Sequence, residues 1–277
     1  MNNIRISTIV PYLKRNDEQH NRLIDNSTIK DIRLSGEVII TDQSPQGLPL
    51  SFKMASNVAY QHIPLHPDEP FSPGLARNLA ISSSRFVFIF FLDVDLLYSP
   101  ILSNELCSRA ERLAQNHETA FEMYPCLYLT KEETERFDGD FQGCLESFLR
   151  GENHRVEGIA LASSCLLLNR EWFLQLGGFD ERFVGHGGED LELIDRLCQH
   201  YPIGPRPADY GLNIKAQHPG DYQGLRRYFS YYALPHLFAG RFLVHQWHPR
   251  PLTHPYHKRR AGNDALLEQM LANPGPL

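Results

Sequence analysis

The sequence lacks three features, and each absence excludes a class of protein. No apolar run approaches the ~20 residues that a membrane-spanning helix needs, and residues 1–5 (MNNIR) do not begin a signal peptide. The five cysteines are odd in number and contain no Cys-x-x-Cys pair, which argues against a disulfide framework and a thiolate zinc site. We expect reduced core cysteines in a cytoplasmic protein, with peripheral association at the inner face of a membrane left open.

Basic charge is the third scarce feature. The formal net charge is −6, so the chain has no overall cationic field and we expect no nucleic-acid partner. The one basic stretch is residues 257–260 (HKRR). The 277 residues are 42% apolar, which is enough for a substantial core, and no repeat or linker divides them. We therefore expect a single domain over residues 1–277.

Residues 86–95 (FVFIFFLDVD) are the centre of the predicted fold. Their seven leading apolar residues, β-branched or aromatic on both alternate faces, are typical of a strand that helices cover on both sides. Because a carboxylate is costly to bury unpaired, we expect the strand to end at Asp93. Asp93 and Asp95 then lie beyond the carboxyl end of the strand, where open α/β sheets bind their ligands.

Strand and helix patterns alternate along the chain, which predicts an α/β fold with a mostly parallel central sheet and crossover helices. We expect strands over residues 4–10, 37–42, 121–129, 159–168 and 242–244. We expect helices over residues 21–29, 74–82, 99–115, 169–176, 189–197 and 263–271. Pro11 is predicted to stop the first strand, residues 61–73 to form a loop, and Arg77 and Asn78 to lie on the polar side of their helix.

The two aspartates form a candidate metal site. They are spaced by two residues, so in extended chain both carboxylates point the same way around Val94. Hard oxygen ligands suit a divalent cation that carries phosphate, and a Mg²⁺ or Mn²⁺ site has room for an imidazole. His245 and His248, at the end of a late strand, are the candidates, although with 13 histidines in the chain either one taken alone reads as an ordinary core or surface residue.

A second acidic site follows a glycine-rich turn. Gly187 and Gly188 precede Glu189 and Asp190 at the start of a helix. The helix dipole alone favours acids in a first turn, but two glycines before a simple cap cost backbone entropy. A carboxylate in such a turn can deprotonate an acceptor hydroxyl, and Asp190 is our candidate base.

Five motifs follow one another along the chain. They are Pro11-Tyr12-x-x-Arg15, Ala76-Arg77-Asn78, Asp93-Val94-Asp95, Gly177-Gly178-Phe179-Asp180-x-x-Phe183 and Gly187-Gly188-Glu189-Asp190. In this order they resemble nucleotide-sugar glycosyltransferases of the GT-A fold, over roughly residues 4 to 250. The likeness is to the catalytic region of β-1,4-galactosyltransferases and to bacterial chondroitin-type capsule polymerases. It implies a Rossmann-like sheet, with a nucleotide-binding half over residues 1–98 and an acceptor-binding half over residues 99–277.

The resemblance also implies a role for each matched position. The donor pocket would be lined by Pro11, Tyr12, Arg15, Asp42, Arg77, Asp93 and Val94. Asp93 would lie near the ribose or the metal, and Asp95 would bind Mn²⁺ (or Mg²⁺). His245 or His248 would supply the metal-binding imidazole. Gly188, Glu189 and Phe179 would contact the acceptor, and Asp190 would be the base. The implied reaction moves a hexose or N-acetylhexosamine from a UDP-sugar to a glycan or glycolipid acceptor, in bacterial surface polysaccharide synthesis.

Two departures from the family pattern leave alternatives open. His186 stands where galactosyltransferases carry a tryptophan, so stacking on the acceptor is not implied there. Leu191 and Glu192 follow the pattern of polypeptide N-acetylgalactosaminyltransferases, which retain configuration but carry Asn where this chain has Asp190. The acid favours inversion over retention. The alternatives are a retaining enzyme of the same fold and a sugar-nucleotide or glycan-binding module without turnover. A nucleotidyltransferase is less favoured, because no early glycine-rich phosphate loop is present.

Overall fold

The protein is built around a six-stranded sheet with the strand order β3-β2-β1-β4-β9-β6. The computed structural model describes residues 4–25, 36–48, 57–66, 69–116, 119–250 and 254–272. The strands are β1 (Ile6–Tyr12), β2 (Gly36–Asp42), β3 (Val58–His62), β4 (Phe88–Phe91), β6 (Phe121–Met123) and β9 (Leu166–Asn169). β9 pairs antiparallel with both β4 and β6, and the other pairings are parallel. The expected mostly parallel sheet is therefore confirmed, with β9 reversed.

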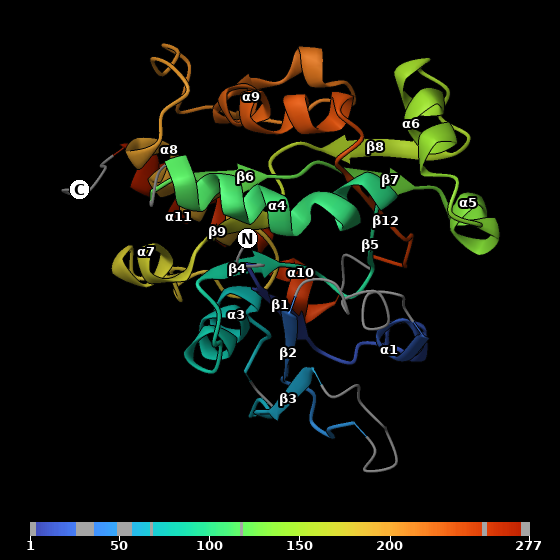
Figure 1. Ribbon diagram of the computed structural model, residues 1–277, viewed down its shortest axis with the longest axis vertical. Helices are drawn as coiled ribbons and strands as arrows, with labels where there is room; N and C mark the ends of the chain where they lie inside the picture. The colour runs from blue at the N-terminus through green and yellow to red at the C-terminus, as the bar shows by residue number, and fades with distance from the viewer. Residues whose placement is uncertain are drawn as a thin grey trace.

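A second, four-stranded sheet continues from the first (Figure 1). Its order is β5-β12-β7-β8, with β5 (Leu96–Tyr98), β7 (Cys126–Leu129), β8 (Val156–Ala160) and β12 (Leu243–His245). A short ribbon pairs β10 (Asn213–Ile214) with β11 (Gln223–Gly224). β4 ends at Phe91 and β5 begins at Leu96, so the segment with the two aspartates joins the two sheets.

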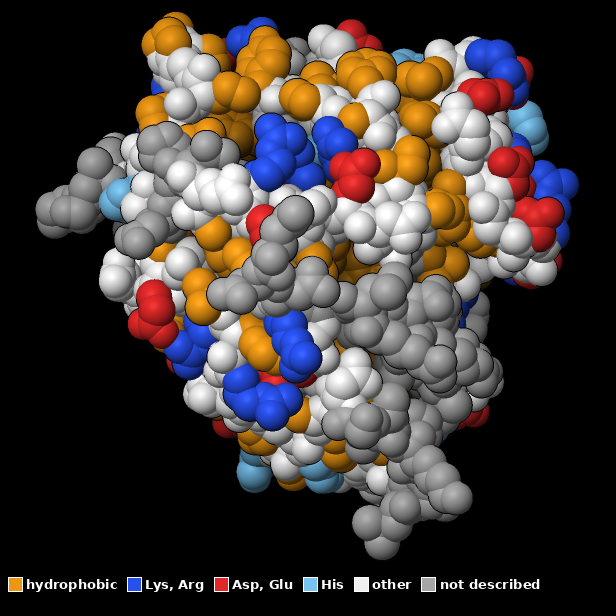
Figure 2. All heavy atoms as spheres, viewed as in Figure 1, with side chains coloured by type: hydrophobic (Ala, Val, Ile, Leu, Met, Phe, Trp, Pro, Cys, Tyr) orange, Lys and Arg blue, Asp and Glu red, His pale blue; other side chains and the backbone are white. Residues whose placement is uncertain are grey.

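Helices cover both faces of the larger sheet, as Figure 1 shows. The described residues form the helices α1 (Asp17–Asp25), α3 (Pro73–Ser82), α4 (Pro100–Asn116), α5 (Lys131–Arg136), α6 (Phe141–Leu149), α7 (Arg170–Gln175), α8 (Glu189–His200), α9 (Leu225–Phe238), α10 (Pro255–Lys258) and α11 (Arg260–Ala272), with a 3-10 turn, η2 (Pro219–Asp221). No helix among these described residues is long and apolar enough to cross a bilayer. On the face drawn in Figure 2, basic, acidic and hydrophobic side chains are interspersed.

Alternation along β4 divides the apolar residues into two cores. Ile89 and Phe91 face a core that α3, α7, α8 and α9 share, whereas Phe88 and Phe90 face a core that α1 and α4 share. Successive strand residues point to opposite faces of a sheet, so a strand covered on both sides must be apolar at every position. This confirms the expectation drawn from the apolar run, which the structure shortens to Phe88–Phe91.

The first strand continues through Pro11, where we expected it to stop. β1 pairs with β4 only as far as Ile9, and beyond that point it pairs with β2 alone, from Val10 to Tyr12. Proline has no amide hydrogen to donate, and it is tolerated in a strand that lacks a neighbour on one side. The missing donor at Pro11 therefore leaves no partner on β4 unsatisfied.

Two expected strands are each divided between the two sheets. Residues 121–129 form β6 in one sheet and β7 in the other, and residues 159–168 contribute the end of β8 and most of β9. Continuous apolar runs do not reveal such a crossing, because both sheets bury their strands. The structure also places β3 partly in the expected loop 61–73. The first helix begins at Asp17, and residues 26–29 of its expected range lie outside the described residues.

Candidate active site

One cleft of about 650 Å³ collects residues from four of the five motifs. It lies past the carboxyl ends of β1 and β4, which is where open α/β sheets bind ligands. The predicted residues that line it are Pro11, Tyr12, Arg15, Arg77, Asp93, Val94, Asp95, Gly188, Glu189, Asp190, His245 and His248. Asp95 and Asp190, far apart in the sequence, thus open onto the same space.

Asp95 and two histidines form a compact group at one end of the cleft. β12 pairs antiparallel with β5 and sets His245 opposite Leu96, next to Asp95. The Oδ2 atom of Asp95 lies 3.4 Å from Nε2 of His245 and 3.2 Å from Nε2 of His248. One potential ligand atom from each residue lies within 4.8 Å of the others. The Nδ1 atom of His248 is 3.0 Å from the carbonyl oxygen of Pro249, a contact that orients metal-binding histidines.

The charges of this group suit a divalent cation. Burial lowers the pKa of His245 to about 4, so its ring is neutral at neutral pH and has a lone pair to offer. Burial alone would raise the pKa of Asp95, which is 4% exposed, but the two imidazoles outweigh it and the pKa lies below its usual range. One carboxylate and two imidazoles fit a cation such as Mn²⁺.

Asp93 does not belong to this group, contrary to the expectation that both aspartates bind metal. The backbone turns between them, with the amide of Leu96 donating to the carbonyl of Asp93 at 3.2 Å. The two carboxylates therefore do not follow the alternation of an extended strand. Asp93 instead accepts hydrogen bonds from Arg77 at 2.9 Å and from Ser164 at 3.2 Å.

Arg77 is the centre of a second charged group. Its side chain is 2% exposed, so the expectation that it lies on the polar side of its helix is wrong. Its guanidinium contacts Asp93 at 2.9 Å, Asp190 at 3.1 Å and Glu189 at 3.8 Å. Burial opposes the positive charge, but these acids outweigh it and raise the pKa of Arg77. A permanent cation thus holds three carboxylates at the cleft wall.

The two acids at the start of α8 differ in exposure. Burial, with help from Asp190, raises the pKa of Glu189 to about 8, and its Oε2 atom has no hydrogen-bond partner. Asp190 is 27% exposed to the cleft, and burial together with the charge of Asp93 raises its pKa. A reachable carboxylate with a raised pKa is suited to accept a proton, whereas the free Oε2 atom of Glu189 is buried.

The glycine turn before α8 requires glycine for a steric reason. Gly188 has φ of +99°, and a Cβ atom there would lie 2.6 Å from the ring of Phe183. The side chain of Asn263 donates to the carbonyls of Val184 and His186 and holds this turn against α11. The backbone path that delivers Glu189 and Asp190 to the cleft therefore leaves no room for a side chain at Gly188.

Gly188→Ala is expected to cost about 1–3 kcal/mol of folding stability through backbone strain, with added loss from the clash with Phe183. The variant should melt at a lower temperature in calorimetry and should have a lower kcat, because α8 shifts with its carboxylates. Gly262→Ala is the matched control, since Gly262 lies within α11 and a Cβ there meets no atom within 4 Å. A Gly188→Ala protein as stable and active as Gly262→Ala would contradict this steric role.

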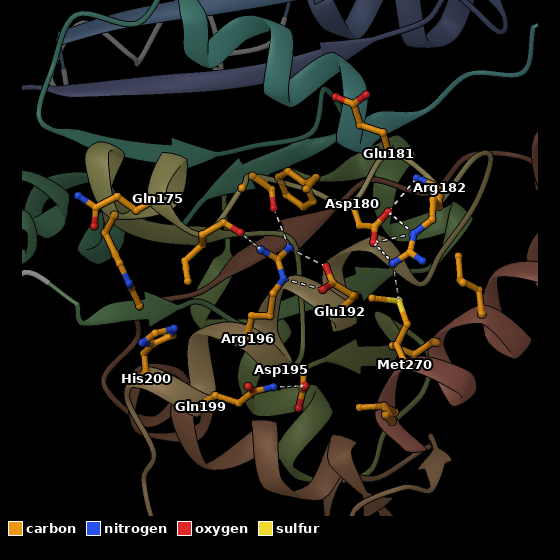
Figure 3. Close-up of a pocket in the computed structure, with 18 of the residues that line it drawn as sticks. Gln175, Asp180, Glu181, Arg182, Glu192, Asp195, Arg196, Gln199, His200 and Met270 are labelled. Carbon is orange, nitrogen blue, oxygen red and sulfur yellow. Dashed lines mark hydrogen bonds and ion pairs between the residues drawn. The ribbon is translucent and has the colours of Figure 1, made fainter. Parts of the chain in front are cut away.

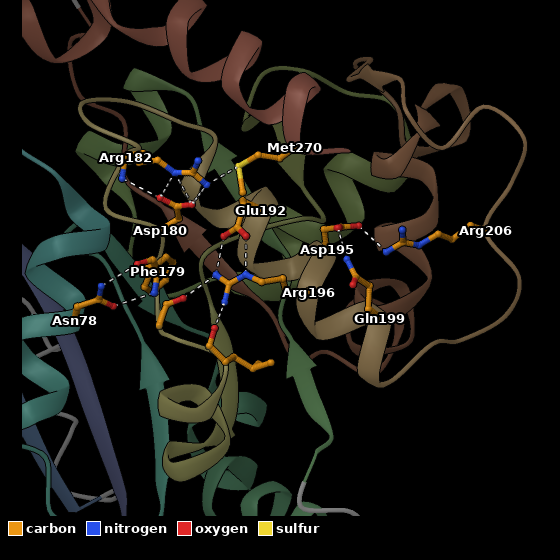
Figure 4. A network of polar contacts seen from close by, with 12 residues as sticks. Asn78, Phe179, Asp180, Arg182, Glu192, Asp195, Arg196, Gln199, Arg206 and Met270 are labelled. Atoms are coloured by element: carbon orange, nitrogen blue, oxygen red, sulfur yellow. Dashed lines mark hydrogen bonds and ion pairs between the residues drawn. The ribbon is translucent and has the colours of Figure 1, made fainter. Parts of the chain in front are cut away.

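A polar network behind the cleft joins the elements that carry its charged residues (Figure 4). Arg196 of α8 donates to the carbonyls of Leu176 and Gly178, at 2.7 Å each, and pairs with Glu192. The amide side chain of Asn78 on α3 exchanges two 2.9 Å hydrogen bonds with the backbone of Phe179. The network therefore ties α3, which carries Arg77, to α8, which carries Asp190.

A larger cavity of about 980 Å³ lies on the other side of this network. Figure 3 shows Glu192, Arg196, His200 and Met270 around it. It is bounded by residues of α7, α8 and α11, and the described residues that line it include neither Arg77 nor the Asp95 group. Both arginines that line it are paired with acids, Arg182 with Asp180 and Arg196 with Glu192.

Two predicted site residues lie outside the cleft lining. Phe179 is 1% exposed and packs against Phe91 with ring centroids 5.1 Å apart, directly beneath the guanidinium of Arg77. Its ring has no surface to offer an acceptor, so the expected acceptor contact is not met and the ring instead supports Arg77. Asp42 is buried and accepts hydrogen bonds from the hydroxyl of Tyr60 and the amide of Ser44.

The cleft also contains residues that sequence reasoning missed. They are Tyr128, Ser164, Lys215, Arg226, Arg250, Tyr256 and Arg260. Tyr256 lies under Arg15, whose guanidinium carbon is 5.0 Å from the ring centre. The one available signal was the basic stretch at residues 257–260, because the other positions are isolated in sequence and converge only through the fold.

The family to which the chain belongs shows that the protein is a glycosyltransferase. The model of the family described as "Glycosyltransferase like family 2" matches residues 8–273, and the chain belongs to that family. No curated protein matches the chain significantly. Among solved structures, the crystal structure of S. aureus TarS 1–349 is similar, with 15% sequence identity and a TM-score of 0.37. That match covers 68% of this chain and 53% of the TarS chain, so the chain spans about half the length of that protein's structure.

Proposed function

We propose that the protein is a metal-dependent, inverting glycosyltransferase that moves a hexose or N-acetylhexosamine from a UDP-sugar to a hydroxyl of a glycan or glycolipid. One observation carries the proposal. The Asp95, His245 and His248 group and the partly exposed carboxylate of Asp190 line the same cleft. Its volume of about 650 Å³ falls within the ~300–1,000 Å³ of ligand pockets.

Each group has a distinct task in this proposal. A divalent cation held by Asp95, His245 and His248 would supply charge neutralisation for the departing diphosphate. Arg77 holds Asp93 and Asp190 in fixed positions and keeps their negative charge compensated. Asp190 accepts the proton of the attacking hydroxyl, which raises the nucleophilicity of that oxygen as it approaches the sugar. Glu189, whose buried Oε2 atom has no hydrogen-bond partner, would contact the acceptor.

Inversion is favoured over retention by the position of the acids. A single displacement requires a base on the acceptor side, and the reachable, raised-pKa carboxylate of Asp190 supplies one. The motif order supports the likeness to galactosyltransferases and capsule polymerases, and with it a role in bacterial surface polysaccharide synthesis at the inner face of the membrane. In this proposal residues 1–98 bind the nucleotide and residues 99–277 bind the acceptor.

A donor screen tests the proposal. The full chain is incubated with a panel of UDP-sugars, with either Mn²⁺ or EDTA, and UDP release is measured. We expect release from at least one UDP-hexose or UDP-N-acetylhexosamine that depends on Mn²⁺ and increases when glycans are added. NMR of the product should show the anomer opposite to that of the donor. Release that EDTA leaves unchanged would exclude the metal, and a retained anomer would exclude inversion.

A further inference from the structure

Four basic side chains line one wall of the cleft. Lys215 follows β10, Arg226 lies in the first turn of α9, Arg250 follows β12, and Arg260 begins α11. They come from four separate parts of the chain, and the overall formal charge of the protein is −6. Because the chain as a whole is acidic, this cluster of cations arises from the tertiary structure and not from the overall composition. We call these four residues the basic wall.

The members of the basic wall are close enough to repel one another. The Nζ atom of Lys215 and the guanidinium carbon of Arg250 each lie 5.0 Å from the ring centre of Tyr128. Burial, together with the charges of Arg226, Arg250 and Arg260, lowers the pKa of Lys215 to about 8. Like charges this close cost free energy in a cleft of reduced dielectric constant unless anions compensate them.

The protein's own acids compensate the basic wall only in part. Arg260 pairs with Asp264 at 2.9 Å, and Arg250 reaches Glu157 at 3.9 Å. The Nε atom of Arg226 donates to Asn213, which is neutral. Among the residues that the structure describes, no acid forms an ion pair with Lys215 or with Arg226. The wall therefore has two acids for four cations, and an anionic ligand would supply the missing charge.

The position of the basic wall points to the acceptor. Arg260 lies against the glycine turn before Glu189 and Asp190, since a Cβ atom on Gly187 would be 3.1 Å from its NH1 atom. The other end reaches Tyr128, whose ring centre is 4.9 Å from that of His245. The wall thus runs from the proposed base to the proposed metal site. A glycan that lies along the wall would bring a hydroxyl to Asp190, while the proposed cation at Asp95 would serve the diphosphate.

We propose that the acceptor is an anionic glycan whose phosphate, sulfate or carboxylate groups lie against Lys215, Arg226, Arg250 and Arg260. This inference rests on the proposed function, because it names the substrate class of the same cleft. Charge complementarity of this kind selects charged over neutral acceptors and weakens as salt screens it. Lys215 contributes most directly, because it lines the cleft and forms no ion pair with an acid among the described residues.

A binding experiment on the full chain tests the inference without requiring turnover. Fluorescently labelled phosphate-, sulfate- and carboxylate-bearing hexasaccharides are each compared with their dephosphorylated, desulfated or carboxyl-reduced counterparts by anisotropy. We expect at least one charged class to bind about tenfold more tightly than its neutral counterpart, with the preference decreasing as salt rises. The class that binds identifies the acceptor's acidic group. Equal binding of charged and neutral forms in every class would overturn the inference.

Two variants locate the binding. Lys215→Met keeps the aliphatic stem and removes the charge, and it should weaken binding of the charged hexasaccharide about fivefold, as loss of a partly exposed charge contact does. Lys258→Met is the matched control, because Lys258 is exposed in α10 and outside the cleft lining. UDP affinity with Mn²⁺ should be the same in both variants. If Lys215→Met weakens UDP binding instead, the basic wall holds the donor and the inference fails.

The inference and the proposed function can fail separately. Donor turnover with Mn²⁺, together with equal binding of charged and neutral hexasaccharides, would leave the glycosyltransferase proposal standing and refute the anionic acceptor. In the opposite case, the chain binds charged hexasaccharides selectively, Lys215→Met weakens this binding, and no UDP-sugar shows Mn²⁺-dependent release of UDP. That result would support the basic wall as an anionic glycan site and refute the donor class.

Discussion

Asp190→Asn is expected to lower kcat by about two to four orders of magnitude, the usual loss when a general base is removed. The substitution keeps the size of the side chain and an oxygen that can accept the hydrogen bond of Arg77, which is 3.1 Å away in the native protein. UDP binding in the presence of Mn²⁺ should therefore stay close to that of the native enzyme. Calorimetry with UDP and a steady-state assay with the donor found in the screen provide the two measurements.

The pH dependence gives an independent check on Asp190. A base works only when ionised, and both burial and the charge of Asp93 raise the pKa of Asp190. The native rate should therefore begin to fall, as the pH is lowered, at a higher pH than an ordinary aspartate would allow. Asp180→Asn is the control, because Asp180 pairs with Arg182 outside the cleft lining. Near-native turnover of Asp190→Asn would exclude it as the base.

Asp95→Asn is expected to remove Mn²⁺-dependent UDP binding. Metal affinity should fall by at least about 100-fold, because loss of a residue that only supports a metal ligand already costs up to that much. Asp95 supplies the negative charge of the proposed ligand group, and an amide oxygen replaces it with a neutral, weaker ligand. Titration of Mn²⁺ followed by electron paramagnetic resonance measures the affinity. Calorimetry with UDP, with and without Mn²⁺, then measures the effect on the donor.

Asp93→Asn is the matched comparison for the metal prediction. Asp93 lies two residues from Asp95 but faces Arg77 and Ser164. Its replacement should leave Mn²⁺ affinity within a few fold of native and act on the Arg77 group instead. Equal losses of Mn²⁺ affinity in the two variants would show that both aspartates bind the metal. Unchanged affinity in Asp95→Asn would remove the Asp95 group from the proposal altogether.

Much of the fold could be predicted because its signals are local. The helices expected at residues 74–82 and 99–115 are α3 and α4, within one residue at each end. Their starts are marked by Ser72 and Ser99, whose hydroxyls accept the hydrogen bond of the amide three residues on. The continuous apolar run of β4 likewise follows from burial on both faces. The crossing of residues 121–129 between two sheets had no local signal, because an apolar strand is suitable for either sheet.

The sequence by itself determined the α/β class and the two acidic stretches that lie in the cleft, Asp93-Val94-Asp95 after β4 and Gly187-Gly188-Glu189-Asp190 before α8. Only the tertiary structure decided which partner each acid has. Pairing of β12 with β5 brings His245 to Asp95, and the turn at Asp93 directs that carboxylate to Arg77. The physical reason is that side-chain period and helix caps depend on neighbours in sequence, whereas charge pairing depends on segments that only the folded sheet brings together.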